Sequence, residues 1–307
     1  MPPIEMLPDL FFFQRGYLNA NHFALRSDSP VLIDTAYLAD WEETERILAS
    51  VGVDSRRVDR IITTHCHCDH IGGHQLVQQR SGCDIAVHRI GKHFMDTGDD
   101  WSPWWRYFQQ KASFFDATVA LEDGDRVAVG RHEFTVVHTP GHAADHTVLY
   151  HPKERLLISS DLLWESDMAV INLRVEGSAA VFTMLSSLDR IASLEVRRVY
   201  PGHGRPFSDF QAALHTARKR LEGYLDRPQL IGRDLLKKII VYTLMMRGAV
   251  PEHRFFPDLM KTHWFPETVD FYFDGAYRES YDDVLSGFLR RGIVMREYGK
   301  LHTTVKP

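Results

Sequence analysis

Short apolar runs alternate with helical patterns along the first two thirds of the chain. Each short run is bounded by polar or glycine-containing turns, which predicts a strand, whereas longer stretches with apolar residues three and four positions apart predict helices. This mixture of hairpins and strand–helix alternation is typical of an α/β fold with mixed sheets. Strands are expected at residues 10–13, 22–25, 31–33, 58–62, 84–87, 148–150, 156–158 and 199–200, and helices at 40–50, 71–80, 180–192 and 208–225.

The segment TVALEDGDRVAVGRHEFTVVHT predicts three further strands. Asp123-Gly124 and Gly130-Arg131 separate its apolar runs, and both pairs favour tight turns. Just before it lies WSPWWRYFQQKASFF, residues 101–115, which is dense in aromatic side chains. No internal repeat or low-complexity segment interrupts this part of the sequence.

From about residue 227 the pattern becomes helical. Asp226-Arg227-Pro228 interrupts the preceding helix pattern, so we place a domain boundary there and expect domains at residues 1–226 and 227–307. The sequence IVMREYGKLHTTV then predicts a terminal hairpin with Tyr298-Gly299 at its turn. Helices followed by such a hairpin resemble a winged-helix module. The helices are expected at residues 234–247, 251–261, 267–273 and 281–291.

Composition and charge narrow the class of protein. The hydrophobic share of 44% and the charged share of 25% are those of a soluble globular protein. A net charge of -5 gives no general attraction to nucleic acid or to an anionic membrane. From His215 onward, however, 16 Lys and Arg face 12 Asp and Glu, which is a mild basic excess.

The cellular setting is also constrained. No apolar stretch approaches the roughly 18 residues that suggest a membrane span, and MPPIEMLPDLFFFQRG lacks the basic start and long apolar run of a signal peptide. The cysteines Cys66, Cys68 and Cys83 do not make a disulfide framework. We therefore expect a cytoplasmic protein with no membrane association.

Four apolar strands are each followed by a polar loop that contains His or Asp. DRIITT precedes HCHCDH, EFTVVHTP precedes GH, RLLISS precedes an Asp, and RRVYP precedes GHG. Functional side chains concentrate in loops that a rigid sheet holds in place. If these loops share one edge of the sheets, seven side chains converge, namely His65, His67, Asp69, His70, His142, Asp161 and His203.

Seven imidazole and carboxylate groups suit two divalent metal ions that share a bridging carboxylate. On extended backbone alternate side chains point the same way, so His65 and His67 can bind one ion together. Asp69 and His70 are adjacent, so a turn must bring them to the second ion. Zinc is the first choice of metal, with iron or manganese as alternatives.

The motif order H-x-H-x-D-H, T-P-G-H, strand-ending Asp and P-G-H-G resembles the metallo-β-lactamase superfamily over roughly residues 10–225. The resemblance implies an αββα sandwich with two sheets between outer helices. It implies that Asp161 bridges two metal sites and that Asp34, at the end of an opening hairpin, supports the metal loop from behind. The implied sites are His65, His67 and His142 for one ion, and Asp69, His70 and His203 for the other.

The function expected from such a centre is hydrolysis of a carboxyl ester, thioester or lactone by a hydroxide that bridges the two metals. Asp69 and Asp161 are the expected catalytic carboxylates, since Asp69 can also hold the proton of the nucleophile. True β-lactamases of the superfamily carry Cys in place of Asp161, which argues against β-lactam hydrolysis. Cys66 and Cys68 occupy variable positions of the motif and are expected to be buried spacers.

Four residues are expected near a small-molecule substrate. His146 lies four residues after His142 and could orient the substrate or pack behind the ligands. Trp164 stands where lactonases of the superfamily have a Tyr, and it lacks the hydroxyl. Trp104 and Trp105 belong to the aromatic segment, which we expect to cover a pocket for a hydrophobic acyl or aromatic group, or to form a homodimer contact.

Three other functions compete with this one. The helical tail resembles the β-lactamase-like protein 2 branch, which suggests cleavage of a phosphodiester in nucleic acid. The stretch THCHCDH is similar to that of persulfide dioxygenases with a single iron, although their last ligand loop departs from P-G-H-G. A binding module without catalysis would be expected to lack ligands, and here none is missing.

Overall fold

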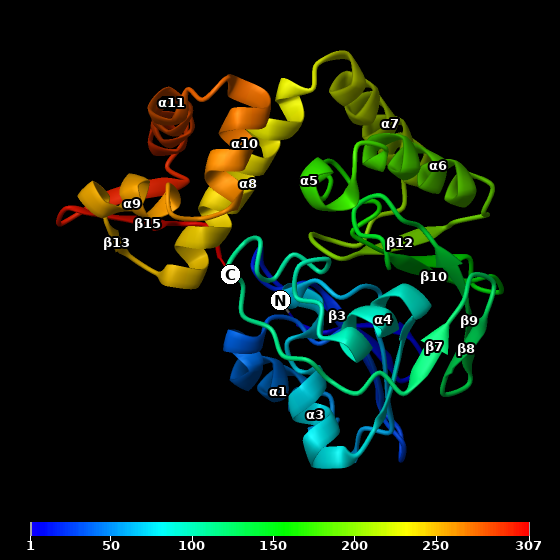
Figure 1. Ribbon diagram of the computed structural model, residues 1–307. Coiled ribbons are helices and arrows are strands. Elements are labelled where there is room, and N and C mark those ends of the chain that lie inside the picture. Colours follow the sequence, from blue (N-terminus) through cyan, green and yellow to red (C-terminus); the bar gives the residue numbers. More distant parts are fainter. Residues whose placement is uncertain (1, 307) are drawn as a thin grey trace.

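Two β-sheets packed face to face form the centre of the protein, seen in a computed structural model that describes residues 2–306. The first sheet has strand order β1-β2-β3-β4-β5-β6-β7 and the second has β12-β11-β10-β9-β8. Helices α1, α3 and α4 cover the outer face of the first sheet, and α6 and α7 cover that of the second (Figure 1). The predicted αββα sandwich is confirmed.

The first sheet changes from antiparallel to parallel at β4. Strands β1 to β4 are antiparallel neighbours, whereas β4, β5, β6 and β7 run parallel. Parallel neighbours need crossover connections, which helices provide. The elements are β1 (Ile4–Leu7), β2 (Leu10–Phe13), β3 (His22–Leu25), β4 (Val31–Ile33), α1 (Trp41–Ser50), β5 (Arg60–Ile62), α2 (Cys68–Ile71), α3 (His74–Ser81), β6 (Asp84–His88), α4 (Arg89–Thr97) and β7 (Val119–Leu121).

The second sheet is antiparallel except for its last pair, β11 and β12. The three strands predicted in residues 118–139 are present, but β7 pairs with β6 in the first sheet while β8 pairs with β9 in the second. Asp123-Gly124 therefore lies where the chain passes between the sheets. The elements are β8 (Arg126–Val129), β9 (His132–His138), β10 (Thr147–His151), β11 (Leu156–Ser160), α5 (Leu173–Glu176), α6 (Ala180–Ala192), β12 (Arg198–Pro201) and α7 (Phe210–Asp226).

Strand β2 shows why the sheets stack this way. Leu10 and Phe12 lie in the hydrophobic core between the sheets, and Phe11 and Phe13 lie under the helices of the first sheet. Successive side chains of a strand point to opposite faces. Because both faces are covered, the strand is apolar throughout instead of alternating with polar residues.

The tail consists of helices and a small three-stranded sheet. Helix α7 ends at Asp226 and α8 begins at Gln229, at the predicted interruption. A short strand, β13, joins the expected hairpin. The likeness to a winged helix stays a prediction. The elements are α8 (Gln229–Arg247), β13 (Val250–Pro251), α9 (Glu252–Leu259), α10 (Trp264–Phe273), α11 (Tyr277–Arg290), β14 (Val294–Glu297) and β15 (Lys300–Thr303).

The tail shares a core with the rest of the protein. A single cluster of buried apolar side chains includes Leu188 of α6, Leu221 of α7, Leu236 of α8 and Trp264 of α10. In Figure 1 the tail helices stand beside the sandwich. The hydrophobic core runs across the domain boundary that we expect from the sequence. The division into two domains stays a prediction.

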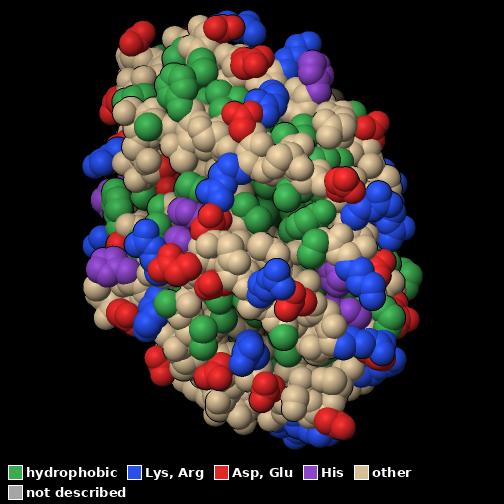
Figure 2. Space-filling model, turned by 90° about the vertical axis from the view of Figure 1, so that its right-hand side faces the viewer, with side chains coloured by type: hydrophobic (Ala, Val, Ile, Leu, Met, Phe, Trp, Pro, Cys, Tyr) green, Lys and Arg blue, Asp and Glu red, His purple; other side chains and the backbone are tan. Residues whose placement is uncertain are grey.

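Among residues 2–306 no helix combines the length and the apolarity needed to cross a bilayer. On the face drawn in Figure 2, Lys and Arg side chains alternate with Asp and Glu side chains.

Candidate metal centre

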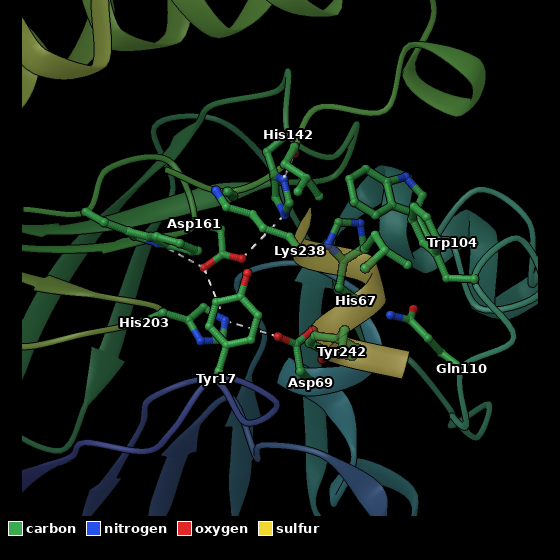
Figure 3. A pocket seen from close by; sticks show the side chains of 15 residues that line it. Tyr17, His67, Asp69, Trp104, Gln110, His142, Asp161, His203, Lys238 and Tyr242 are labelled. Atoms are coloured by element: carbon green, nitrogen blue, oxygen red, sulfur yellow. Dashed lines mark hydrogen bonds and ion pairs between the residues drawn. The ribbon is translucent and has the colours of Figure 1, made fainter. Parts of the chain in front are cut away.

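The predicted ligands come together because four strands deliver them from their carboxyl ends, and a fifth strand delivers the supporting residue Asp34. Parallel strands β4 and β5 are followed by Asp34 and by the loop that begins at Thr63, and β9, β11 and β12 precede the other ligand loops. In Figure 3 Asp161 lies between His142 and His203. The carboxyl ends of parallel strands meet at one edge, where ligand sites commonly form.

The motif divides its ligands by a change of backbone conformation. His67 is extended, with φ -68° and ψ 149°, and α2 begins at the next residue, Cys68. The extended part carries His65 and His67, and the first turn of α2 turns Asp69 and His70 toward a second position. This is the turn that the adjacency of Asp69 and His70 required.

The donor atoms form two groups with a carboxylate between them. Three sets of donors each lie within 4.8 Å of one another: His65, His67 and His142; Asp69, His70 and His203; and His65, His70 and Asp161. Asp161 Oδ2 lies 3.4 Å from His142 Nε2 and 3.6 Å from His70 Nε2. Asp161 therefore has the position that a bridging ligand needs.

Histidine nitrogens without hydrogen-bond partners indicate whether metal ions fit among these residues. Nε2 of His67, His70 and His142 is buried without a hydrogen-bond partner among residues 2–306. A buried polar atom left unpaired costs about 1–3 kcal/mol, so three in one cluster indicate a ligand that binds their lone pairs. A set of imidazoles and carboxylates suits zinc, and it also suits iron or manganese. The residues present fit two divalent ions.

The other side of two of these rings, those of His70 and His142, is fixed by a polar partner. Asp34 Oδ2 lies 2.7 Å from His70 Nδ1, and Asp34 Oδ1 accepts from the Thr64 backbone N–H at 2.9 Å. Nδ1 of His142 lies 2.8 Å from the Val170 carbonyl oxygen. Such bonds leave Nε2 directed at the ion. Asp34 adopts φ +57°, a strained conformation of the kind that clusters at functional sites.

The pKa shifts of three candidate ligands favour the protonation states that bind a cation. Burial lowers the pKa of His65 and His67 well below the ordinary value, so both rings are neutral and can coordinate. Burial raises the pKa of the Asp161 carboxyl, but His203 and His70 outweigh this effect and hold it well below its usual range. Asp161 is therefore ionised, as a bridging ligand must be.

A pocket opens over the ligands. The Trp104 ring lies against that of His67, with centroids 4.0 Å apart and a tilt of 37° between the ring planes. Trp164 donates its indole N–H to Asp161 Oδ1 at 3.3 Å. Both tryptophans line the pocket, and their contact with a substrate stays a prediction. The lining consists of Tyr17, His67, Asp69, Trp104, Phe108, Gln110, His142, Asp161, Trp164, Ala169, Val170, His203, Lys238, Ile239 and Tyr242.

Two residues expected at the substrate lie elsewhere. His146 is fully buried, with Nδ1 2.9 Å from Thr139 Oγ1 and Nε2 accepting from the Asp161 backbone N–H at 3.1 Å. Both ring nitrogens are thus engaged, and the ring positions Asp161 from behind. Trp105 is buried away from the pocket and donates its indole N–H to the Cys66 carbonyl oxygen at 2.9 Å.

The cysteines of the motif are buried thiols outside the donor groups. Cys66 and Cys68 belong to the hydrophobic cluster on the outer face of the first sheet. The Cys66 backbone N–H donates to the Asp145 carboxylate at 2.9 Å, which holds the motif from that side.

Four pocket residues lie outside the ligand loops and were not predicted from the sequence. Tyr17 lies in the loop between β2 and β3, and Lys238, Ile239 and Tyr242 lie on α8 of the tail. Nothing in their local sequence marks them. Their approach to the metal ligands depends on how the tail packs, which only the three-dimensional arrangement reveals.

Comparison with known proteins agrees with this geometry. The profile of the metallo-beta-lactamase superfamily matches residues 18–203. The acyl-coenzyme A thioesterase MBLAC2 of Homo sapiens is 26% identical over 198 residues, which is 60% of this chain and 67% of the human protein. A hydroxyacylglutathione hydrolase of Pseudomonas aeruginosa is 32% identical over 160 residues, 52% of each chain.

A solved structure extends the likeness to the tail. A metallo-beta-lactamase family protein from Thermus thermophilus aligns with 97% of this chain and 99% of its own, at a TM-score of 0.64 and 21% identity. At that identity the match shows a shared fold. The related enzymes are hydrolases, which confirms the prediction of a metallohydrolase. The chain belongs to the metallo-β-lactamase superfamily.

Proposed function

We propose that the protein is a metal-dependent thioester hydrolase with two divalent ions, zinc first, and a hydrophobic acyl substrate. The observation that carries the proposal is the pair of donor groups that share Asp161, with three unpartnered nitrogens, beneath a pocket with apolar walls. His65, His67 and His142 would hold one ion and Asp69, His70 and His203 the other, with Asp161 common to both. Bound ions of this kind lower the pKa of water and polarise a carbonyl group.

The protein's own groups would orient the reactants. Asp69 Oδ2 lies 3.1 Å from His203 Nε2, and Asp69 also faces the pocket, where its carboxylate can hold the proton of the attacking water. Trp164 restrains Asp161 through its indole N–H. The rings of Trp104 and Phe108 exclude water from one side of the pocket and provide an apolar surface for the acyl group.

The pocket's charge favours an acyl substrate over a phosphodiester. Lys238 is the one Lys or Arg that lines it within residues 2–306. Its Nζ lies 3.1 Å from carboxylate oxygens of both Asp167 and Asp234, so its charge is already neutralised. Binding a nucleic-acid backbone requires several free cations, and this pocket supplies none among the described residues.

The similar proteins support the choice of thioester among acyl compounds. One is named an acyl-coenzyme A thioesterase and another a hydroxyacylglutathione hydrolase. An acyl group on sulfur is common to the substrates that these names describe. We therefore place thioesters before oxygen esters and lactones.

The proposal is tested with the zinc-loaded protein and matched substrates. Acyl thioesters of increasing chain length, the corresponding oxygen esters, a lactone and a bis-aryl phosphodiester are compared by kcat/KM. We expect the thioesters to be hydrolysed fastest, with longer acyl chains preferred. Faster turnover of the phosphodiester would overturn the proposal.

A variant checks that the hydrolysis belongs to this centre. Asp161→Ala removes the shared carboxylate and should lower kcat/KM by more than about 100-fold together with the bound metal, because even supporting residues of metal sites cost about 10–100-fold. Asp283→Ala, an exposed carboxylate that pairs with Arg233 on the tail, is the control and should leave both unchanged. Full activity of Asp161→Ala would remove Asp161 from the proposed site.

A further inference from the structure

Most hydrogen-bond donors that line the pocket are already used within the protein. The indole N–H of Trp104 donates to Glu176 Oε1 at 2.7 Å, and that of Trp164 donates to Asp161. The Tyr242 hydroxyl donates to the Leu18 carbonyl oxygen at 3.0 Å. Lys238 is held by two carboxylates. These groups shape the pocket but have no donor to spare for a substrate.

The Tyr17 hydroxyl is different. It has no hydrogen-bond partner among residues 2–306, although Tyr17 lines the pocket. In Figure 3 the hydroxyl points into the middle of the pocket, toward Asp161. The Tyr17 ring centroid lies 6.4 Å from that of His203 and 6.3 Å from that of Tyr242. A free donor therefore stands beside the second group of metal ligands.

The backbone around Tyr17 is held from two sides. The Tyr17 backbone N–H donates to the Lys306 carbonyl oxygen at 3.0 Å, which connects the end of the tail to this loop. The carbonyl oxygen of the preceding residue, Gly16, lies 3.3 Å from His203 Nδ1. The segment that supports the ligand His203 thus also positions the hydroxyl, and a donor fixed before the reaction needs no reorganisation during it.

The remaining free donor in the pocket is less well placed. The side-chain amide of Gln110 also has no hydrogen-bond partner among the described residues. Figure 3 shows Gln110 beyond His67, on the side of the pocket away from Asp161 and His203. The Gln110 amide therefore lies on the far side of the pocket from Asp161 and His203, beside which the Tyr17 hydroxyl stands.

We propose that Tyr17 is a catalytic residue whose hydroxyl donates a hydrogen bond to the substrate carbonyl oxygen as that oxygen gains negative charge. The inference rests on the proposed thioester hydrolysis. Hydroxide forms a bond to the acyl carbon, and the carbonyl π electrons move to the oxygen that Tyr17 contacts. When the carbonyl re-forms, the C–S bond breaks and the thiolate leaves. The new carboxylic acid passes its proton to the thiolate, so the products are the carboxylate and the thiol. Tyr17 keeps its proton throughout.

The protonation state of Tyr17 agrees with a donor role. A tyrosine hydroxyl ordinarily ionises near pH 10. Burial raises the pKa of Tyr17 well above that value, and the carboxylates of Asp234 and Asp167 raise it further. At neutral pH the group is a hydrogen-bond donor, and it is not a base.

The direct test is Tyr17→Phe, which removes the oxygen and keeps the ring. Removing one donor from an oxyanion site typically costs about 10²–10³ in kcat, so we expect a loss in that range with little change in KM and unchanged metal content. Tyr298→Phe, at the fully exposed turn of the tail hairpin, is the matched control and should behave as wild type. An unchanged kcat in Tyr17→Phe would overturn the inference.

A binding measurement separates this role from a structural one. An alkylphosphonate, in which phosphorus replaces the acyl carbon, carries the negative oxygens of the reaction's charged state, whereas the thioether analogue of the substrate has no such oxygen. Tyr17→Phe should weaken phosphonate binding by about 10–100-fold, the range for a hydrogen bond to a charged group, and leave thioether binding unchanged. Equal weakening of both ligands would show a structural effect and contradict the inference.

Thioesters with different leaving groups show whether the Tyr17 hydroxyl acts on the carbonyl oxygen or on the departing sulfur. If Tyr17 acts on the carbonyl oxygen, its loss costs the same factor for thioesters of acidic and of ordinary thiols. A loss that grows with the pKa of the thiol would overturn the assignment to that oxygen. Wild-type protein that cleaves no thioester would instead contradict the proposed function itself, so the two failures are distinguishable.

Discussion

At the scale of single residues, Trp104 links a metal-ligand candidate to a partly buried acid. Its ring packs against that of His67, and its indole N–H donates to Glu176 at 2.7 Å. Burial raises the pKa of Glu176 from its ordinary 4.5 to about 8. A carboxyl group with a raised pKa in the folded state binds protons more tightly there than in the unfolded chain, so it opposes folding as the pH rises.

This linkage predicts the pH dependence of Glu176→Gln. Between about pH 4.5 and 8 the folded protein holds the Glu176 proton and the unfolded chain loses it. The free energy of unfolding of the wild type should therefore fall relative to that of the variant across this window, by on the order of 1–3 kcal/mol. Gln keeps a carbonyl oxygen for the Trp104 N–H. Denaturant titrations at pH 5 and pH 8 measure the difference, and parallel curves for the two proteins would refute it.

The sequence predicts residues well where chemistry follows local spacing. The seven donors could be named because their motifs are short and each follows an apolar run. Tyr17 could not be named, because its role depends on a loop held by the far end of the chain. His146 and Trp105 were expected beside the substrate, but hydrogen bonds to Thr139 and Cys66, not evident from the sequence, turn them away.

At the scale of elements, the loop after β12 requires a residue without a side chain, Gly202. A Cβ placed on Gly202 would lie 2.1 Å from Asp161 Oδ1 and 3.0 Å from the Ser160 carbonyl carbon. Neither the shared carboxylate nor the backbone of β11 can move away cheaply. The glycine therefore allows the loops after β11 and β12 to approach each other at the metal centre.

Gly202→Ala should accordingly displace Asp161. We expect loss of bound metal and a fall in kcat/KM of more than about 10-fold, the lower end of the cost of disturbing a ligand's support. Gly223→Ala in α7 is the control, because a Cβ there meets only Leu230 at 4.0 Å. It should retain metal and activity, with equal or slightly higher stability. Normal metal content in Gly202→Ala would contradict the proposed dependence on close loop packing.

Element boundaries were predicted best where apolar runs are continuous. Strands β3 and β4 and helix α6 have the predicted bounds, whereas α8 begins at Gln229 and not at residue 234. The residues between these two positions include Gly232, which is buried in α8. A Cβ at this position would lie 2.5 Å from the Tyr272 ring, so the glycine lies inside α8 and permits close packing with α10.

At the scale of the whole molecule, the tail and the sandwich share both a core and a pocket. Leu236 of α8 and Leu188 of α6 lie in one buried cluster, and Ile239 of α8 lines the pocket. The sequence predicted a separate helical module, but it could not indicate how that module docks. Docking depends on apolar side chains that are far apart in the chain.

A shared core predicts a single cooperative unfolding transition. Far-ultraviolet circular dichroism, which follows helices, and tryptophan fluorescence should give the same denaturant midpoint for the metal-free protein. Two separate transitions, with the helical signal lost first, would show that the tail folds independently and that the common core contributes little.

The central claim is that seven side chains hold two ions that hydrolyse a thioester. Its most direct test is the rate of thioester hydrolysis by the chelator-treated protein as zinc is added in known equivalents. The account predicts no activity without metal, an increase up to two equivalents per chain, and a plateau thereafter. Full activity at one equivalent would contradict the two-ion centre, and no activity at two equivalents of zinc, iron or manganese would contradict the proposed function.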